Sequence, residues 1–287
     1  MTISQTLSGV TVVNLAINVP GPCAAARLRE MGAEVIKVEP PNGDSLNLIA
    51  PQWYSELAEG TAVETVDLKS AEGLDRINEL LDTADVFITS HRRATLKKLG
   101  LYDAHLNHPR LCHIEIVGDT ENPDVPGHDL TYQAAAGILE PPHNPKILAG
   151  DITGSEQAVS AALALLLRRV STGEGGRTTI GLRQGAEESA GPLVHGLTAP
   201  GGFLGGAVPG YGLYQAADGW VAVAALEPHF AAGLAAAAGS GEGDIDVTSS
   251  RAPLEKFFSD KSVAELADWA AEHQLPITPV RSAPRAH

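Results

Sequence analysis

The sequence predicts an α/β protein with a Rossmann-like, mostly parallel sheet and a second, smaller α+β domain. Three observations lead to this prediction: short apolar runs typical of buried strands, helix-forming stretches between them, and a glycine- and proline-rich stretch after which the pattern changes. Helices that alternate with short apolar strands favour a parallel sheet covered on both faces. We therefore expect a large Rossmann-like domain over 1–198, a linker over 199–210 and a small α+β domain over 211–287.

The chain opens with a strand, a helix and a second strand. VTVVNL at 10–15 is a β-branched run typical of a buried parallel strand, and a turn at 20–22 (PGP) follows it. CAAARLREM at 23–31 favours a helix, and EVIKVE at 34–39 predicts the next strand. The same alternation predicts further helices at 71–81 and 95–99 and strands at 86–89 and 111–117.

Two more helices, at 130–136 and 151–170, and a strand at 177–182 complete the predicted large domain. The turn after the first strand reads NVPGPCA, whereas dinucleotide-binding Rossmann domains carry GxGxxG there. We therefore predict a Rossmann-like fold that binds neither NAD nor FAD.

The predicted small domain begins with a hairpin. YGLYQAADGWVAVAAL at 211–226 is typical of two strands joined at Asp218-Gly219, a dipeptide that favours tight turns. Three helices are expected after it, at 228–238, 253–258 and 262–273. The last of these begins with a capping box, in which Ser262 is the N-cap and Glu265 stands three residues later.

Charge and cysteine content exclude several function classes. Lys and Arg number 20 against 35 Asp and Glu, and the resulting net charge of -15 opposes binding to nucleic acid or an anionic membrane. The two cysteines, Cys23 and Cys112, form no Cys/His cluster, and His113 and Glu115 are expected to be exposed strand positions, so we predict no metal site. With no leader-like N-terminus and no apolar run of about 18 residues, a cytoplasmic protein is expected.

Three places combine a titratable group with a turn or the end of an element. His128 stands at the start of a helix and can act as acid or base, since histidine has an unperturbed pKa of about 6.5; alternatively, Asp129 caps that helix and the histidine is incidental. Asp151 begins the long apolar helix either as its N-cap or as a catalytic carboxylate. Glu227 closes an apolar strand and either points into a cleft or begins the next helix.

Several segments together resemble the class III CoA-transferase (CaiB/BaiF) family, which includes the α-methylacyl-CoA racemases. The resemblance runs from about residue 7 to about residue 280. Its segments are LSGVTVVNLAINVPGPCAAARLREMGAEVIKVEPPNGD at 7–44, VDLKSAEG at 66–73, ADVFITSHRRATLKKLGL at 84–101, NHPRLCHIEIVG at 107–118 and STGEGGRTTIGL at 171–182.

Within the family, three motifs resemble the racemase branch. PGHDLTYQAAAG matches a GHD-x-x-Y motif that supplies a catalytic histidine, here His128; LAGD places Asp151 at the catalytic aspartate; and ALEPHF places Glu227 where a glutamate hydrogen-bonds that histidine. The resemblance implies a racemase or epimerase of 2-methyl-branched acyl-CoA thioesters. One of His128 and Asp151 would remove the α-proton and the other would return a proton to the opposite face. Backbone N–H groups at the start of the Asp151 helix would stabilise the thioester oxyanion.

Two other functions stay open. In the transferase branch the same aspartate is a nucleophile that forms an anhydride and then an aspartyl-CoA thioester, and that branch does not need the histidine. A repurposed, non-catalytic homologue is the third possibility. It is favoured by the lost basic stretch, because the chain has EGTA at 59–62 where the family has a sequence of the type NRGKRS.

The resemblance also implies a partner and a ligand. The large domain would bind coenzyme A as a thioester substrate, with no prosthetic group. Arg92 matches a CoA-contacting arginine, and Ser90 and His91 beside it are further expected contacts. The resemblance implies a homodimer, since family members form homodimers of interlocked subunits, and it implies a chain that continues for several dozen residues beyond the TPV motif at 278–280. We expect this returning segment to be missing here, with consequences for the interlocking.

Overall fold

The structure is a computed structural model that describes residues 5–239 and 250–282. It divides into two compact units, residues 1–190 and 191–287, and each has a hydrophobic core of its own. The division falls between Ala190 and Gly191, which is earlier than the expected end of the large domain at 198. The expected linker, 199–210, contains a short kinked turn at Phe203–Ala207 and belongs to the second unit.

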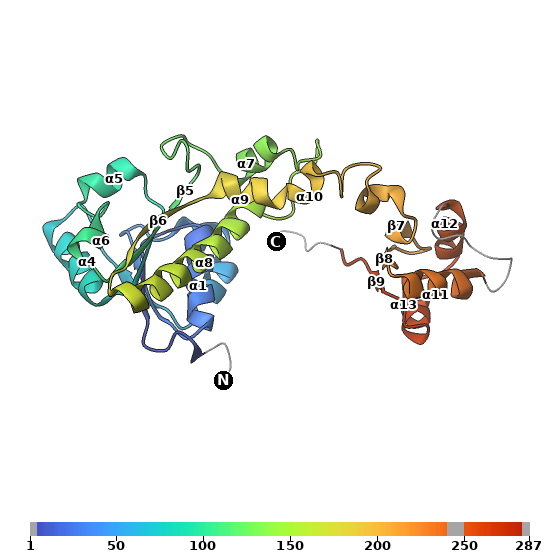
Figure 1. The fold of residues 1–287 in the computed structure, drawn as a ribbon, viewed down its shortest axis with the longest axis horizontal. Coiled ribbons are helices and arrows are strands. Elements are labelled where there is room, and N and C mark those ends of the chain that lie inside the picture. Colours follow the sequence, from blue (N-terminus) through green and yellow to red (C-terminus); the bar gives the residue numbers. More distant parts are fainter. Residues whose placement is uncertain (1–4, 240–249, 283–287) are drawn as a thin grey trace. The chain divides into compact units, whose positions relative to one another are not determined.

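A six-stranded sheet forms the centre of the first unit (Figure 1). All neighbouring strands are parallel, in the order β3-β2-β1-β4-β5-β6, which confirms the predicted Rossmann-like sheet. The sequence did not predict β3, an edge strand of sequence AVET with no buried residue. The strands are β1 (Thr11–Asn14), β2 (Glu34–Glu39), β3 (Ala62–Thr65), β4 (Val86–Thr89), β5 (Cys112–Val117) and β6 (Gly176–Gly181).

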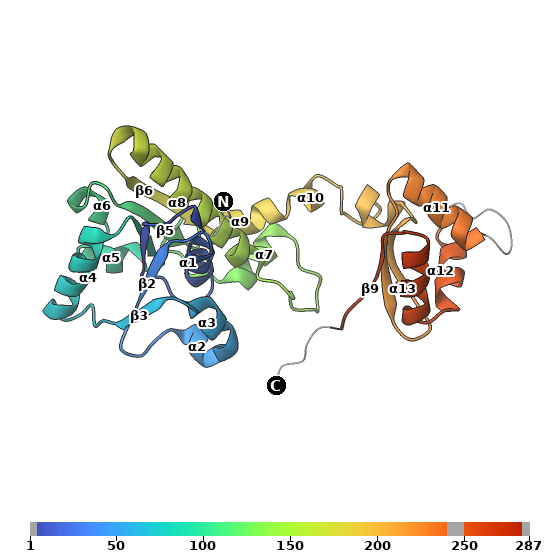
Figure 2. The same ribbon diagram turned by 90° about the horizontal axis from the view of Figure 1, so that it is seen from below.

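Helices cover both faces of this sheet (Figure 2). On one face, α1 (Pro20–Glu30) and α8 (Ala149–Thr172) pack together over side chains of β1, β4 and β5. The other face is covered by α4 (Ala71–Thr83), α5 (Arg93–Lys98) and α6 (Ala104–Asn107). The remaining helices of the unit are α2 (Ser45–Ile49), α3 (Pro51–Ala58), α7 (Asp129–Ala136) and α9 (Leu182–Ser189).

Two local expectations were wrong. The predicted turn at 20–22 is the first turn of α1, where Pro20 needs no hydrogen-bond donor because the first N–H groups of a helix have no partner inside it. His113 and Glu115 were expected to be exposed, but both are fully buried in β5. Because helices cover both faces of this parallel sheet, the side chains on both faces of β5 are buried and none of them points to solvent.

The second unit holds a three-stranded antiparallel sheet in the order β7-β8-β9. The predicted hairpin is formed by β7 and β8, and the predicted capping box of Ser262 and Glu265 is present. The sequence did not predict β9, which pairs with β8. The elements are α10 (Gly191–Val194), β7 (Tyr211–Gln215), β8 (Trp220–Ala224), α11 (Pro228–Gly239), α12 (Ala252–Ser259), α13 (Val263–Glu272) and β9 (Ile277–Pro279).

Among the described residues, no helix is both long enough and apolar enough to cross a membrane. The longest helix, α8, carries Asp151, Glu156, Arg168 and Arg169 along its 24 residues.

Candidate active site

A cavity of about 590 Å³ opens in the first unit at the carboxyl ends of the parallel strands. Its walls include 17–20 after β1, 90–92 after β4, 116–118 at the end of β5 and Leu182 after β6. Strands β1 and β4 are neighbours in the sheet, and the order of the strands reverses between them. Open α/β sheets bind their ligands at this topological switch point.

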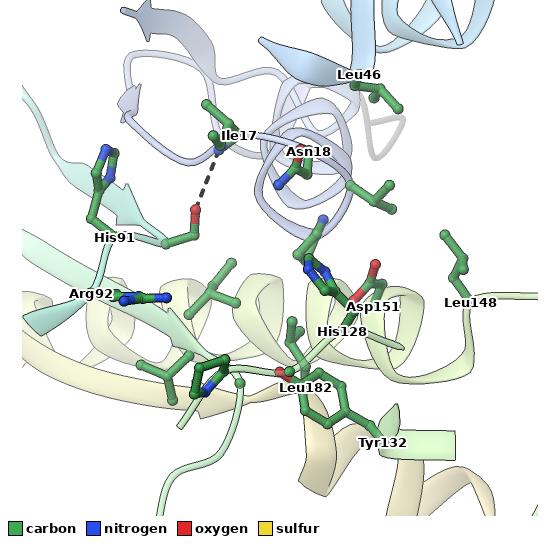
Figure 3. Close-up of a pocket in the computed structure, with 18 of the residues that line it drawn as sticks. Ile17, Asn18, Leu46, His91, Arg92, His128, Tyr132, Leu148, Asp151 and Leu182 are labelled. Atoms are coloured by element: carbon green, nitrogen blue, oxygen red, sulfur yellow. Dashed lines mark hydrogen bonds between the residues drawn. The ribbon is translucent and has the colours of Figure 1, made fainter. Parts of the chain in front are cut away.

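His128 and Asp151 both line this cavity, although 22 residues separate them in the sequence. Asp151 is the third residue of α8, so the helix presents its carboxyl group from a fixed first turn. His128 immediately precedes α7, and its backbone is held by Thr131, whose Oγ1 accepts the His128 N–H at 3.1 Å and donates to the His128 carbonyl at 2.7 Å. Figure 3 shows the two side chains on one side of the cavity, with His91 and Arg92 on the other.

Asp129 is buried behind these two residues and caps α8, not α7. Its Oδ1 accepts the backbone N–H groups of Gly150 at 2.7 Å and of Asp151 at 3.1 Å, and its Oδ2 accepts from Gln133 Nε2. Asp151 is therefore not the N-cap of the long helix. We expected backbone N–H groups at the start of this helix to stabilise an oxyanion, but those of Gly150 and Asp151 donate to Asp129.

The environment of Asp151 favours its neutral form. Burial raises the pKa of this carboxyl group to about 7, and the negative charge of Asp129 adds to the rise. A carboxyl group that titrates near neutral pH holds and releases a proton with similar ease under physiological conditions. Asp151 therefore has the property required of a general acid and base.

Tyr132 also lines the cavity and was given no role by the sequence reasoning. It lies one helical turn after His128, and burial followed by the charge of Asp151 raises the pKa of its phenol. A Cβ atom added at Gly118 would overlap the Tyr132 hydroxyl, and one added at Gly127 would overlap the ring and the hydroxyl, so both glycines allow the close approach of this side chain. The spacing of the GHD-x-x-Y motif was the signal that could have identified this residue.

The three expected CoA contacts lie together at the end of β4 and line the same cavity. Ser90 Oγ accepts the N–H of Ile17 at 3.4 Å, which joins the loops after β4 and β1. Burial lowers the pKa of His91, and its Nδ1 is buried without a hydrogen-bond partner in the described part of the chain. Arg92 is exposed at the N-terminus of α5. Their contact with CoA remains a prediction.

Glu227 lies in the second unit, where it is exposed between β8 and α11. Its hydrogen bond to His128 therefore remains a prediction. In residues 5–239 and 250–282, no group of three or more His, Cys, Asp or Glu residues is arranged to hold a metal ion.

Sequence comparison matches CoA-transferase family III over residues 7–286. The (R)-2-hydroxy-4-methylpentanoate CoA-transferase of Clostridioides difficile is 32% identical over 212 residues, which cover 66% of this chain and 53% of the relative. The alpha-methylacyl-CoA racemase of Homo sapiens is 30% identical over 245 residues, covering 78% of this chain and 62% of the relative. The matched region thus spans between about half and two thirds of the length of these curated relatives.

Two solved structures share the fold. A hypothetical protein from Mycobacterium tuberculosis gives a TM-score of 0.81 at 24% identity and covers 97% of this chain and 86% of that one. A CAIB/BAIF family protein from Brucella suis gives 0.80 at 22% identity, with 97% and 85% covered. These likenesses show the fold. The family match over residues 7–286 confirms the resemblance found in the sequence, and the chain belongs to CoA-transferase family III.

Proposed function

We propose that this protein is a racemase or epimerase of 2-methyl-branched acyl-CoA thioesters. One observation carries the proposal: two groups able to exchange protons, His128 and Asp151, line one cavity, and the carboxyl group has a pKa of about 7. Inversion at a carbon atom requires one group to remove a proton and another to supply a proton to the opposite face.

The reaction begins when one of the two residues takes the proton from the carbon next to the thioester carbonyl. The electrons of the C–H bond move into the carbonyl group, which gives a planar enolate. The second residue then donates its proton to the opposite face of that carbon, and the thioester re-forms with inverted configuration. One group ends protonated and the other deprotonated, so the reverse reaction starts from the opposite pair of states.

Glu227 would orient His128 and stabilise its cationic form, as the family motif implies. Arg92, His91 and Ser90 would bind CoA. CoA carries several phosphate charges, and Arg92 brings a permanent positive charge to the cavity wall.

A CoA-transferase is the second candidate, favoured by the 32% identity to the Clostridioides difficile transferase. Asp151 would then attack a thioester as its carboxylate and form an anhydride, which the released CoA thiolate opens to an aspartyl-CoA thioester. A raised pKa lowers the fraction of Asp151 present as carboxylate, which favours proton transfer over nucleophilic attack.

Hydrogen–deuterium exchange tests the proposal. Incubation of the protein with a 2-methylacyl-CoA in deuterated water should replace the α-proton with deuterium, and His128→Ala and Asp151→Asn should each abolish the replacement. Asp124→Asn is the matched control, because Asp124 is another carboxylate on the cavity wall without a proposed role. Failure of the wild-type protein to exchange with any 2-methylacyl-CoA would refute the racemase.

The transferase reaction would instead form a covalent adduct on Asp151. Hydroxylamine should trap an acyl or CoA adduct on Asp151 after incubation with acyl-CoA, and His128→Ala should leave this adduct intact. A trapped adduct without exchange of the α-proton would refute the racemase proposal and support the transferase.

A further inference from the structure

The turn after β1 holds Asn18 in an unusual conformation. Its φ of 68° lies in the left-handed region, which is costly for a residue other than glycine, although asparagine tolerates it better than most. Asn18 also lines the cavity, and in Figure 3 it lies above His128 and Asp151. Strained backbone of this kind persists where the surrounding structure holds it, and such positions cluster at functional sites.

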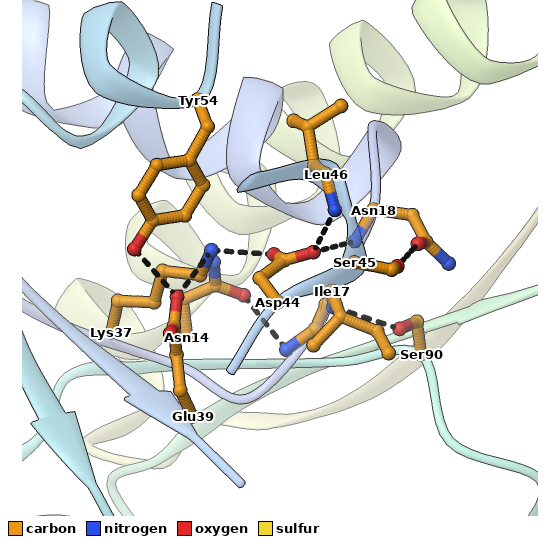
Figure 4. A network of polar contacts seen from close by, with 11 residues as sticks. Asn14, Ile17, Asn18, Lys37, Glu39, Asp44, Ser45, Leu46, Tyr54 and Ser90 are labelled. Atoms are coloured by element: carbon orange, nitrogen blue, oxygen red, sulfur yellow. Dashed lines mark hydrogen bonds and ion pairs between the residues drawn. The ribbon is translucent and has the colours of Figure 1, made fainter. Parts of the chain in front are cut away.

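Two neighbouring residues hold this conformation (Figure 4). Asp44 Oδ1 accepts the backbone N–H of Asn18 at 3.0 Å, and the same atom accepts the N–H of Leu46 at 2.9 Å at the start of α2. Ser45 Oγ donates to Asn18 Oδ1. The acceptor end of the Asn18 amide is therefore occupied, while its Nδ2 donates to no group in the described part of the chain; the residue is exposed and lines the cavity.

Asp44 keeps its place because a buried lysine neutralises it. Lys37 Nζ lies 2.5 Å from Asp44 Oδ2 and 2.9 Å from Glu39 Oε1, and the three residues are only 3%, 1% and 6% exposed in the order Lys37, Asp44, Glu39. Tyr54 completes the cluster, with its hydroxyl donating to Glu39 Oε1 at 2.8 Å. Removing one partner of a buried ion pair leaves the other as an uncompensated charge, so the pair fixes Asp44 firmly.

We propose that Asn18 is a substrate-binding residue, whose Nδ2–H donates to a carbonyl oxygen of the CoA thioester, and that Asp44 with Lys37 positions it. This inference rests on the proposed CoA thioester substrate. The thioester and the two amides of the pantetheine arm all present carbonyl oxygens, which accept such a bond. The hydrogen bond from Ser45 to Asn18 Oδ1 fixes the orientation of the Asn18 amide, so that its Nδ2–H group is available to donate to the ligand.

Asn18→Asp tests the contact, because aspartate tolerates the left-handed backbone and keeps an oxygen for Ser45 but has no Nδ2–H donor. Calorimetric titration with free CoA and with butyryl-CoA should show dissociation constants raised about tenfold. Asn47→Asp is the control, because it adds the same charge on exposed α2 at a residue that does not line the cavity. Weaker binding of both ligands would place the contact on the pantetheine amides. Weaker binding of butyryl-CoA alone would place it on the thioester.

Asp44→Ala tests the positioning role. Glu39→Gln is its matched control, because Glu39 contacts the same lysine but does not contact the turn. Asn18→Gly is the reference variant, because glycine removes the side chain and adopts the left-handed backbone without strain. Asp44→Ala should raise KM and the dissociation constant as much as Asn18→Gly does while leaving kcat unchanged, and the double variant should bind no more weakly than either single variant. If the two substitutions weaken binding additively in the double variant, Asp44 does not act through Asn18 and its role is merely structural.

The outcomes separate this inference from the proposed reaction. If the wild-type protein binds butyryl-CoA but exchanges no α-proton, the racemase fails and the Asn18 contact is still tested by the dissociation constants. If Asn18→Asp binds as tightly as the wild-type protein, or if Asn47→Asp weakens binding as much as Asn18→Asp does, the inference alone is overturned. If the wild-type protein binds neither CoA nor butyryl-CoA, both are overturned.

Discussion

Asp129 Oδ1 accepts the backbone N–H of Asp151 at 3.1 Å, while the negative charge of Asp129 helps to raise the pKa of the Asp151 side chain. One buried carboxylate thus fixes the first turn of α8 and favours the protonated form of the residue that this turn presents to the cavity. Asp129 thus acts on Asp151 in two opposite ways: it attracts the backbone N–H of Asp151 through the hydrogen bond and repels the ionised side chain through its negative charge.

Asp129→Asn should lower the pKa of Asp151 from about 7 toward the ordinary value, because burial remains but the neighbouring negative charge is lost. The asparagine Oδ1 can still accept the two N–H groups at the start of α8. A ¹³C NMR titration of the aspartate carboxyl groups measures the shift, and the acidic limb of the exchange rate should move to lower pH with it. Asp119→Asn, a second carboxylate near Tyr132, should leave the Asp151 titration in place.

Asp151→Asn should stabilise the protein above neutral pH while abolishing the proposed exchange. The folded-state pKa of Asp151 is raised, so the folded protein binds its proton more tightly than the unfolded chain does. The stability that this proton contributes is present below the unfolded pKa of about 4 and is lost as the pH rises to about 7. The variant lacks this loss, so its advantage in chemical denaturation should grow over that interval to at most about 4 kcal/mol, since the folded pKa of about 7 lies about three pH units above the unfolded value. An advantage independent of pH would contradict the proton linkage.

Much of the sheet was predictable, because apolar runs such as EVIKVE and VFIT coincide with β2 and β4. The edge strand β3 was missed because its AVET sequence is mostly exposed and carries no apolar run. Motifs pointed to His128 and Asp151, but the role of Asp129 depends on the packing of α7 against α8, which joins residues 22 positions apart. Asn18 was missed for a similar reason: its left-handed backbone is imposed by Asp44, which local sequence does not reveal.

Arg93 should prove structural, in contrast to its neighbour Arg92. Its Nε and Nη2 contact the two carboxylate oxygens of fully buried Glu115 at 2.9 and 3.0 Å, and Thr179 Oγ1 donates to the same carboxylate at 2.8 Å. Burial alone would raise the pKa of Glu115, but the hydrogen bonds from Arg93 and Thr179 outweigh burial and lower it. Arg93→Met should therefore cost about 2–4 kcal/mol of unfolding free energy, because it leaves a buried charge unpaired.

The pH dependence of the unfolding free energy lost in Arg93→Met shows whether the charge of the arginine or its packing is responsible. Without Arg93, burial raises the pKa of Glu115, so the carboxyl group is protonated in mild acid and its charge no longer needs a partner. The loss should be smaller at about pH 5 than at about pH 8, and the double variant Arg93→Met/Glu115→Met should recover most of the stability. A loss equal at both pH values would show that packing of the arginine, not its charge, is responsible.

Arg92→Ala should weaken CoA binding without changing the stability of the protein. Arg92 is exposed on the cavity wall, and the chain has EGTA at 59–62, where the resemblance implies basic residues, so Arg92 should carry a large share of the phosphate recognition. Loss of one charge-assisted contact predicts a dissociation constant raised about 10- to 100-fold, with a weaker dependence on salt. Calorimetry at two salt concentrations measures both effects. Lys98→Ala removes an equal charge from the same helix outside the cavity lining and should bind CoA normally; equal losses in the two variants would indicate a general field effect in place of a specific phosphate contact.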